Sequence, residues 1–385
     1  MNLRKHLWRI ASYVLVAAAA SVITLSFWGE RYSKLSELEA VINKMFIGTV
    51  DTEKMNDAAA AAMVNALGDR WSYYISAEDY AAHLENKNNA YVGVGITVAA
   101  RADGTGIDIQ EVMPGGSAQE AGILPGDILV EAEGKSAQQM TTDELKTIIR
   151  GKAGTQVQVT VLRDGERKTF TLERREIKVE VATGEILPGN IGYIRIANFN
   201  TNCAKETIAL VNSLQKQGAD KLIFDVRNNP GGYVNEMIKV LDHLLPEGVL
   251  YRDVDYLGNE GAKHSDTACV ELPMAVLVNG NSYSAAEFFA ACLNEYDWAT
   301  VVGEKTTGKG HYQNTIRLDD GSAVNLSTGK YLTPSGVSLT EVGGLTPEVV
   351  IEVDKETAQM IRAQAIPVGE DPQVQAAVES LMKNQ

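Results

Sequence analysis

One serine in this sequence lies where a turn joins an apolar strand to a helix. Ser284 follows an apolar run at residues 274–279 and the turn Gly280-Asn281-Ser282-Tyr283, and a helix-forming stretch at 285–295 begins directly after it. A serine at such a junction projects over the carboxyl edge of an α/β sheet, where open sheets build their sites. The free N–H groups and the positive dipole end of the helix favour a developing oxyanion. Without a base nearby, however, the ordinary interpretation of Ser284 is a helix N-cap.

The candidate base for Ser284 is Lys309. It lies in Gly308-Lys309-Gly310, whose glycines let the backbone approach closely. A lysine amine becomes a general base once desolvation lowers its pKa toward neutrality. Taken alone, a Gly-Lys-Gly segment is more often a surface loop. Four of the histidines occur in no recognisable triad motif: His6, His83, His243 and His264.

Three neighbouring patterns suggest other chemistry and are set aside. Residues 303–309 read Gly-x-x-x-x-Gly-Lys, but Gly310 stands where a nucleotide-binding P-loop needs Ser or Thr for Mg²⁺. Ser213-Leu214-Gln215-Lys216 matches the Ser-x-x-Lys of penicillin-binding enzymes, but it lies in an amphipathic stretch and lacks the companion motifs. His311 would share a strand face with Lys309 and can line the same site. Lys309 remains the preferred base.

The elements that would position Ser284 and Lys309 alternate between strand and helix from about residue 190 onward. This alternation indicates an α/β domain with a largely parallel sheet. We predict strands at 191–196, 221–226, 274–279 and 300–302, and helices at 203–217, 234–245, 285–295 and 372–382.

A glycine-rich β module precedes this domain. In Tyr91-Val92-Gly93-Val94-Gly95-Ile96 a turn enters a strand, so several N–H groups can point at a peptide's terminal carboxylate while the peptide adds as a strand. The alternative is a small β domain with ordinary turns. Residues 114–118 and 121–129, with Pro-Gly-Gly-Ser-Ala and Ala-Gly-Ile-Leu-Pro-Gly-Asp-Ile-Leu, resemble the PDZ pattern of bacterial proteases. We predict strands at 91–98, 106–113, 127–131, 157–163 and 168–172, and a helix at 141–150.

The N-terminal region combines an apolar run with two amphipathic stretches. Arg4, Lys5 and Arg9 precede the run at residues 10–28, which is about as long as a bilayer-spanning helix. A cleaved signal peptide is the rival interpretation, but its apolar region would be shorter. The basic residues predict a cytoplasmic N-terminus, with the chain outside the cytoplasm from about residue 30. Helices expected at 32–46 and 52–67 suggest a stalk or a dimerisation arm.

Composition narrows the function classes. The 385 residues are 45% hydrophobic and 22% charged, which is typical of a globular chain. A net charge of −15 argues against nucleic-acid binding, which requires a basic surface. Cys203, Cys269 and Cys292 are too widely spaced for a zinc knuckle or a redox pair, and we expect buried thiols.

The combination of motifs resembles the carboxy-terminal processing peptidases, also called tail-specific proteases. That family carries Ser-Ala-Ser-Ala-Ser-Glu at its nucleophile and Phe-Gly-Lys-Gly at its base, 25 residues apart, and here 309 − 284 = 25. The resemblance covers roughly residues 35–360, in the family's order. Further matching segments are residues 68–74, 225–232, 331–336 and 344–349.

The resemblance implies roles for further residues. Gln313 would orient Lys309, and the backbone N–H groups of Ala285 and of Gly231 or Gly232 would form the oxyanion hole. Glu295 matches a carboxylate that sometimes has a supporting role, although a solvated helix end explains it equally well. Three positions depart from the pattern, namely Tyr283, Ala286 and Thr307. Tyr283 could narrow the site, and Thr307 in place of Phe predicts a less apolar pocket for the base.

We therefore expect an α/β, ClpP/crotonase-like protease core with an inserted PDZ-like β domain and an N-terminal helical arm. The expected parts are 1–29, a cytoplasmic tip and signal anchor; 30–89, a helical region; 90–174, the PDZ-like domain; 175–365, the peptidase core; and 366–385, a C-terminal helix. The function would be a serine endopeptidase with a Ser284–Lys309 dyad, acting on proteins whose C-terminal tails the PDZ-like domain presents. The alternative is a catalytically silent PDZ scaffold that binds protein C-termini. We expect no metal or organic cofactor, and we expect a homodimer at the cell membrane, with regulation through the PDZ-like domain by a partner.

Overall fold

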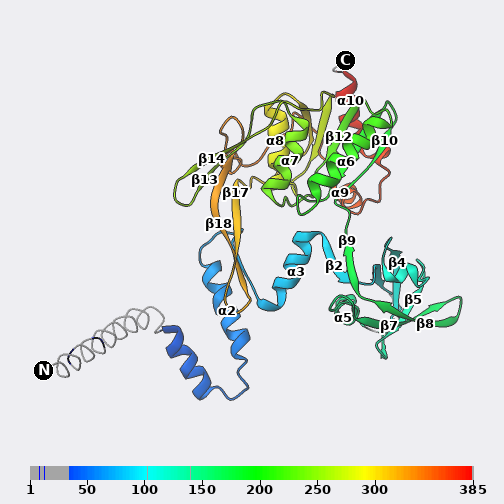
Figure 1. The fold of residues 1–385 in the computed structure, drawn as a ribbon, viewed down its shortest axis with the longest axis vertical. Helices are drawn as coiled ribbons and strands as arrows, with labels where there is room; N and C mark the ends of the chain where they lie inside the picture. The colour runs from blue at the N-terminus through cyan, green and yellow to red at the C-terminus, as the bar shows by residue number, and fades with distance from the viewer. Residues whose placement is uncertain (1–7, 9–12, 14–33, 102, 139, 384–385) are drawn as a thin grey trace. The chain divides into compact units, whose positions relative to one another are not determined.

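The computed structural model describes residues 8, 13, 34–101, 103–138 and 140–383, and these fall into two compact units (Figure 1). The first unit ends at Gly68 and contains a helix at 34–45 and α2 (Thr52–Asn65). The second unit begins at Asp69. Among the described residues no helix is both long and apolar enough to cross a bilayer. The apolar run at 10–28 lies, apart from Tyr13, outside the described residues.

A six-stranded sheet forms the centre of the second unit, in the order β10-β11-β12-β15-β16-β19. Every neighbouring pair is parallel except β10–β11, so the predicted largely parallel sheet is confirmed. The strands are β10 (Ala182–Leu187), β11 (Ile191–Ile196), β12 (Lys221–Asp225), β15 (Met274–Val278), β16 (Ala299–Gly303) and β19 (Val349–Val350).

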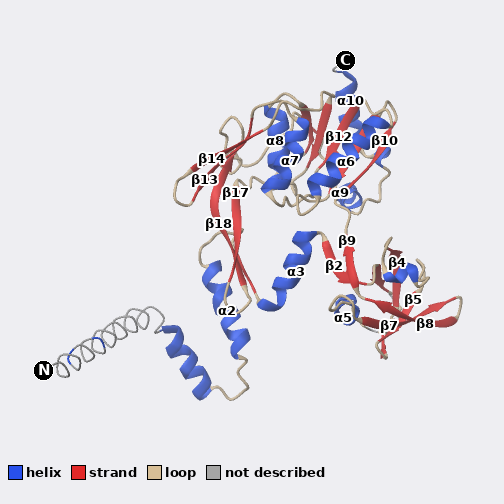
Figure 2. Ribbon diagram, viewed as in Figure 1, coloured by secondary structure: helices blue, strands red, loops and turns tan. Residues whose placement is uncertain are grey.

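Helices cover both faces of this sheet, which is why its central strands are apolar on both sides (Figure 2). Alternate residues of each strand enter different clusters: Phe224 packs in the larger core, whereas its neighbour Ile223 packs in the smaller one. The larger cluster includes α6 (Cys203–Lys216), α7 (Val234–Leu244) and α8 (Ala285–Glu295); the smaller one includes α10 (Pro372–Lys383).

The second unit also contains a five-stranded sheet that the sequence patterns did not predict. Its order is β1-β18-β13-β14, with β17 paired to β18. The strands are β1 (Tyr73–Ile75), β13 (Val249–Asp255), β14 (Glu260–His264), β17 (His311–Arg317) and β18 (Ala323–Leu332). Because β17 begins two residues after Lys309, this sheet fixes the far end of the loop that carries the candidate base.

The β module consists of a sheet in the order β3-β4-β5-β7-β8, with β6 paired to β5. The predicted strand at 91–98 was wrong in one respect: Gly95 has φ of 81°, which breaks it into β2 and β3. β2 pairs instead with β9. The strands are β2 (Ala90–Gly93), β3 (Ile96–Ala100), β4 (Ile107–Val112), β5 (Ile128–Ala132), β6 (Lys135–Ser136), β7 (Gln156–Arg163), β8 (Glu166–Glu173) and β9 (Arg175–Lys178).

The remaining helices connect or close these sheets. α3 (Ala77–Asn88) precedes the β module, whose own helices are α4 (Ser117–Glu120) and α5 (Thr142–Ile149). A capping box starts α5: the Thr141 hydroxyl accepts the N–H of Glu144, whose carboxylate accepts the N–H of Thr141. Near the C-terminus α9 (Lys355–Arg362) and the 3₁₀ turn η1 (Val368–Glu370) lead into α10.

Candidate active site

Ser284 lies at the junction of β15 and α8 in a strained backbone conformation. Its φ of 59° and ψ of −128° are rare for a residue with a side chain, and such strain concentrates at functional sites. Gly231 packs directly against it, and a Cβ on Gly231 would lie 2.8 Å from the Cβ of Ser284. Only glycine therefore allows this close approach, which brings the loop before α7 to the serine.

Lys309 lies half-buried between two aromatic side chains. Its Nζ is 4.4 Å from the ring centroid of Trp71 and 5.8 Å from that of Tyr283. Burial, assisted by the positive charge of Lys87, lowers the pKa of Lys309 to about 8, against the opposing effect of Asp69. The prediction of a less apolar pocket was therefore wrong. The rings of Trp71 and Tyr283 supply the apolar surroundings of Lys309 that Thr307 does not provide.

Glu287 joins the serine segment to the lysine segment. Its carboxylate accepts the backbone N–H groups of Ser284 at 3.2 Å, Gly308 at 2.7 Å and Lys309 at 2.8 Å, and the Thr306 hydroxyl at 2.5 Å. The side chain is completely buried. A buried carboxylate with four donors is satisfied and rigid, so Glu287 fixes the two segments relative to each other. The sequence pattern marked this glutamate without giving it a role.

Tyr331 is a second link between the two segments. Its hydroxyl donates to the carbonyl oxygen of Lys309 and interacts with the side chain of Ser284. Burial raises the pKa of this phenol, so it remains a neutral donor at any ordinary pH. In the described structure no hydrogen bond joins Ser284 Oγ to Lys309 Nζ, because the serine faces Tyr331. The two side chains nevertheless line one cleft of about 890 Å³.

Of the three predicted oxyanion donors, the structure distinguishes one glycine from the other. The N–H of Gly231 donates to Asn229 Oδ1 at 2.8 Å and is already used. The N–H of Gly232 has no acceptor among the hydrogen bonds of the described residues. Ala285 is the first residue of α8, so its N–H has no partner within the helix. Ala285 and Gly232 are therefore the predicted donors whose N–H groups have no acceptor among the described residues.

A buried charge network supports the loop that carries Gly231 and Gly232. Arg227 forms ion pairs with Asp225 at 2.7 Å and with Asp371 at 2.8 Å, and it donates to Gln373 at 2.9 Å. Although burial alone would raise it, the pKa of Asp225 is held below its ordinary value by the Arg227 charge and by hydrogen bonds, including one from Tyr193. The start of α10 is thereby connected to the residue that precedes the candidate oxyanion loop.

Two predicted supporting residues have other partners. The amide of Gln313 donates to the His311 carbonyl at 3.0 Å and to Ser327 Oγ at 3.1 Å; it lines the cleft but does not bond Lys309. The carboxylate of Glu295 accepts the N–H and the hydroxyl of Ser335 at 2.9 and 2.8 Å, outside the cleft lining. The supporting role of Glu295 stays a prediction, while its solvated alternative gains a defined partner.

The predicted peptide-binding residues are divided between β2 and β3. Tyr91, Val92 and Gly93 belong to the pair formed with β9, and Val92 donates its N–H to Glu85 at 3.3 Å. Val94 and Gly95 form the turn between the two strands. Ile96 begins β3, which is the edge strand of its sheet and is therefore open on one side to an added strand.

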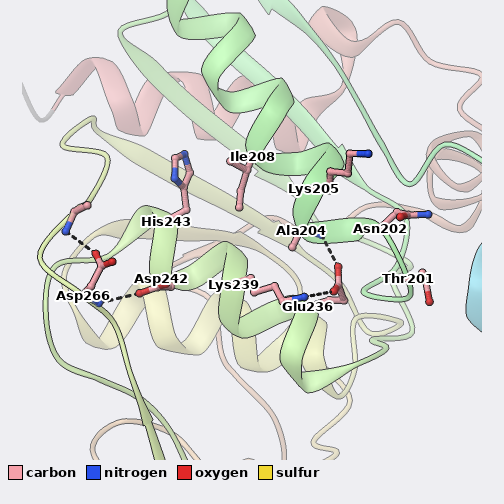
Figure 3. Close-up of a pocket in the computed structure, with 11 residues that line it drawn as sticks. Thr201, Asn202, Ala204, Lys205, Ile208, Glu236, Lys239, Asp242, His243 and Asp266 are labelled. Carbon is pink, nitrogen blue, oxygen red and sulfur yellow. Dashed lines mark hydrogen bonds and ion pairs between the residues drawn. The ribbon is translucent and has the colours of Figure 1, made fainter.

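A second pocket of about 600 Å³ lies between α6 and α7 (Figure 3). Its carboxylates are occupied by the protein itself: Glu236 accepts the N–H of Ala204 and pairs with Lys239, and Asp242 accepts the N–H of Asp266. None of its lining residues also lines the cleft that contains Ser284 and Lys309. Within the described ranges, no group of three or more His, Cys, Asp or Glu side chains could hold a metal ion.

Comparisons with known proteins agree with these features. Residues 190–351 match peptidase family S41, and residues 84–162 match the PDZ domain. The chain is 32% identical over 357 residues to the carboxy-terminal processing protease CtpA of Bacillus subtilis (strain 168), covering 88% of this chain and 76% of the relative. It is 30% identical over 373 residues to a probable CtpA-like serine protease of Staphylococcus aureus (strain N315), covering 91% and 74%. The solved structure of an S41 protease from Bacteroides fragilis shares the fold, with a TM-score of 0.55 at 18% identity, covering 89% of this chain and 93% of that chain.

Proposed function

This chain belongs to peptidase family S41 and is a serine-type peptidase related to the carboxy-terminal processing proteases, and we propose that Ser284 and Lys309 form its catalytic dyad. The observation that carries the proposal is the joint attachment of both segments to the buried Glu287 carboxylate, beside a lysine whose pKa is lowered to about 8. With a pKa of about 8, about a tenth of that amine is unprotonated at pH 7 and about half at pH 8, and this fraction can accept a proton.

The proposed reaction proceeds through an acyl-enzyme. Ser284 Oγ turns from Tyr331 toward Lys309, gives its proton to Nζ and attacks the peptide carbonyl carbon. The N–H groups of Ala285 and Gly232 stabilise the oxyanion. The Lys309 ammonium then gives the proton to the departing amine, and the C–N bond breaks. Water attacks the ester after giving a proton to the regenerated Lys309 amine, and that proton returns to Ser284 as the acid product leaves.

The experiment compares the parent chain with Ser284→Ala and Lys309→Ala, using an unstructured protein as substrate and a fluorophosphonate as a label. We expect cleavage and labelling by the parent and neither by the variants, with losses of at least about 10³-fold. If the parent neither cleaves nor becomes labelled while peptides still bind, the catalytically silent PDZ scaffold is the correct function instead.

We also propose that the PDZ-like module presents substrate C-termini and gates the cleft. The open edge of β3 supports strand addition, and α5 lies against that strand. Removal of residues 90–174 should change the cleavage rate, and a C-terminal peptide added in trans should do the same in the intact chain. An unchanged rate in both assays is evidence that the module has no gating role.

The membrane and dimer predictions remain proposals as well. The apolar run at 10–28, with Arg4, Lys5 and Arg9 before it, supports a single-pass anchor whose peptidase part is extracytoplasmic. A protease added to intact cells should then degrade the peptidase part. The helix at 34–45 and the residues after it expose apolar side chains that a second copy could cover: Leu35, Leu38, Val41, Met45, Phe46 and Ile47. A monomeric mass at micromolar concentration in detergent would contradict the dimer proposal.

A further inference from the structure

The catalytic cleft carries positive charge on a chain whose net charge is −15. Four of its lining residues are cationic, namely Arg70, Lys87, Lys263 and Lys309, whereas Asp253 is the only lining carboxylate among the described residues. None of the four forms an ion pair within the described part of the chain. The cleft is therefore better matched to a substrate with negative charge than to a neutral or basic one.

Lys87 is the most informative of these cations because of where its amine lies. It occupies the last turn of α3, where the helix dipole favours a cation, yet its side chain is half-buried and lines the cleft. Its Nζ lies 5.6 Å from the ring centroid of Tyr233. Tyr233 directly follows Gly232, so the amine stands on the oxyanion side of the cleft.

The backbone around Lys87 is attached to the same loop system. The carbonyl oxygen of Lys87 accepts the N–H of Thr201 at 3.1 Å, and that of Asn86 accepts Asn200 Nδ2 at 3.0 Å. Phe199 in turn donates to the Gly231 carbonyl at 2.8 Å, and its own carbonyl accepts the N–H of Tyr233 at 2.7 Å. The backbone of Lys87 is therefore anchored to the segment that holds the candidate oxyanion donors.

A half-buried ammonium without a counter-charge is unfavourable, and burial lowers the pKa of Lys87 accordingly. Burial is the only cause that lowers the pKa of Lys87, so neither Asp69 nor Glu287, the carboxylates whose charge acts on Lys309, offsets it. Asp69 accepts the N–H of Trp71 and the hydroxyl of Ser72, and Glu287 already has four donors. A ligand carboxylate in the cleft would satisfy Lys87.

We propose that Lys87 is a specificity-determining residue that binds a carboxylate of the substrate close to the scissile bond. Arg70 assists from the exposed rim, where its guanidinium stacks 4.2 Å from the ring centroid of Trp71. The carboxylate comes either from an acidic side chain or from the substrate's own C-terminus. The location relative to the scissile bond rests on the proposed function of Ser284.

The test uses four peptides of one sequence: with Glu or Gln beside the scissile bond, each as a free acid or a C-terminal amide. Cleavage by the full chain should favour a carboxylate-bearing peptide by about tenfold in kcat/KM, equivalent to about 1.4 kcal/mol. Lys87→Gln should abolish the preference, Lys87→Glu should reverse it, and Lys87→Arg should retain it. A Glu/Gln preference identifies a side-chain carboxylate, and an acid/amide preference identifies the terminus.

Binding of the same peptides to Ser284→Ala, with and without Lys87→Gln, measures the recognition without turnover. The result therefore stands even if the peptidase proposal fails. Lys205→Gln removes an equal charge from the exposed residue beside the second pocket (Figure 3) and should leave every ratio unchanged. A carboxylate preference that persists in Lys87→Gln, as a tail held by the PDZ-like module would give, overturns the proposal, as does the absence of any preference in the parent.

Discussion

The two walls of the cleft that contains Ser284 and Lys309 differ in how their side chains are held. On the wall built by β15, α8, β18 and the loop before β17, Glu287 and Tyr331 bind the segments of Ser284 and Lys309 through several hydrogen bonds. On the wall built by residues 69–88, Trp71 and Lys87 face the cleft through ring contacts, and Lys87 forms no ion pair with any residue that the structure describes. The first wall holds the segments of the two proposed catalytic residues in place, and the second determines the burial and the charge around Lys309.

This contrast predicts its largest effect at Glu287. Glu287→Gln replaces a carboxylate that accepts four hydrogen bonds with an amide that must present N–H groups to some of those donors. We expect kcat/KM to fall about 100-fold, since the two catalytic segments lose their common anchor. The matched control is Glu348→Gln, because Glu348 also accepts a backbone N–H, from Val301 at 3.3 Å, but lies outside the cleft lining. Equal activities of the two variants would show that activity does not depend on the anchoring of the two segments by Glu287.

The network behind the oxyanion loop should give the next largest effect. Asp371→Ala leaves the buried Arg227 with one of its two carboxylates, which should lower the free energy of unfolding by about 3 kcal/mol. Because Arg227 precedes the oxyanion loop, we also expect about a tenfold loss of kcat. Glu370→Ala, at the neighbouring residue of the η1 turn, is the control for both chemical denaturation and kinetics. A stable variant with full kcat would show that α10 does not support the loop.

Removing the Lys309 charge should stabilise the fold. The ordinary lysine pKa of 10.5 falls to about 8 in the folded chain, so the unfolded chain binds this proton more tightly. Below pH 8 the folded state carries the full free-energy cost of burying the charged Lys309 amine. The parent gains stability as pH rises from about 8 toward 10.5. Lys309→Met should therefore be more stable than the parent at pH 7 by about 1–3 kcal/mol, a difference that disappears above pH 10.5. Denaturant unfolding at pH 7 and 10.5 measures both values; a less stable variant at pH 7 contradicts the lowered pKa.

A substitution on the opposite wall, at Trp71, should change the pH dependence of activity more than the maximal rate. Trp71→Ala opens the cover over Lys309 to water, so the pKa of the amine should rise toward its ordinary value. Activity at pH 7.5 should fall several-fold and recover at higher pH, while Trp71→Phe keeps most of the cover and should behave like the parent. A pH-independent loss in Trp71→Ala would mean that the ring positions substrate and does not tune the base.

The sequence alone singled out the two residues of the proposed dyad more readily than the residues that surround them in the structure. Ser284 and Lys309 stand in local patterns, a strand–turn–helix and a Gly-Lys-Gly, which adjacent residues reveal. The central sheet followed from apolar runs such as 274–279. By contrast, β17 has no clear signal in the sequence. Its side chains from Asn314 to Arg317 are all exposed, so apolar and polar residues do not alternate along it.

The residues to which the sequence analysis gave no role contact partners that are far away in the sequence. Trp71 approaches Lys309, and Asp371 approaches Arg227, only after the sheets have assembled. α3 gave no helical prediction because its composition is polar and none of its residues is buried. No sequence pattern therefore singled out Lys87. The assignment of Gln313 as the partner of Lys309 came from resemblance, and in the structure its amide has other acceptors.

The most direct test of the dyad is the pH dependence of fluorophosphonate labelling at Ser284 in the full chain. If the neutral amine of Lys309 activates this serine, the second-order labelling rate should rise with pH and reach half its maximum near pH 8, the value set by the lowered lysine pKa. Lys309→Met should abolish the rise. Labelling of Ser284 that is flat across pH 6–10, or that keeps the same profile in Lys309→Met, would contradict the dyad.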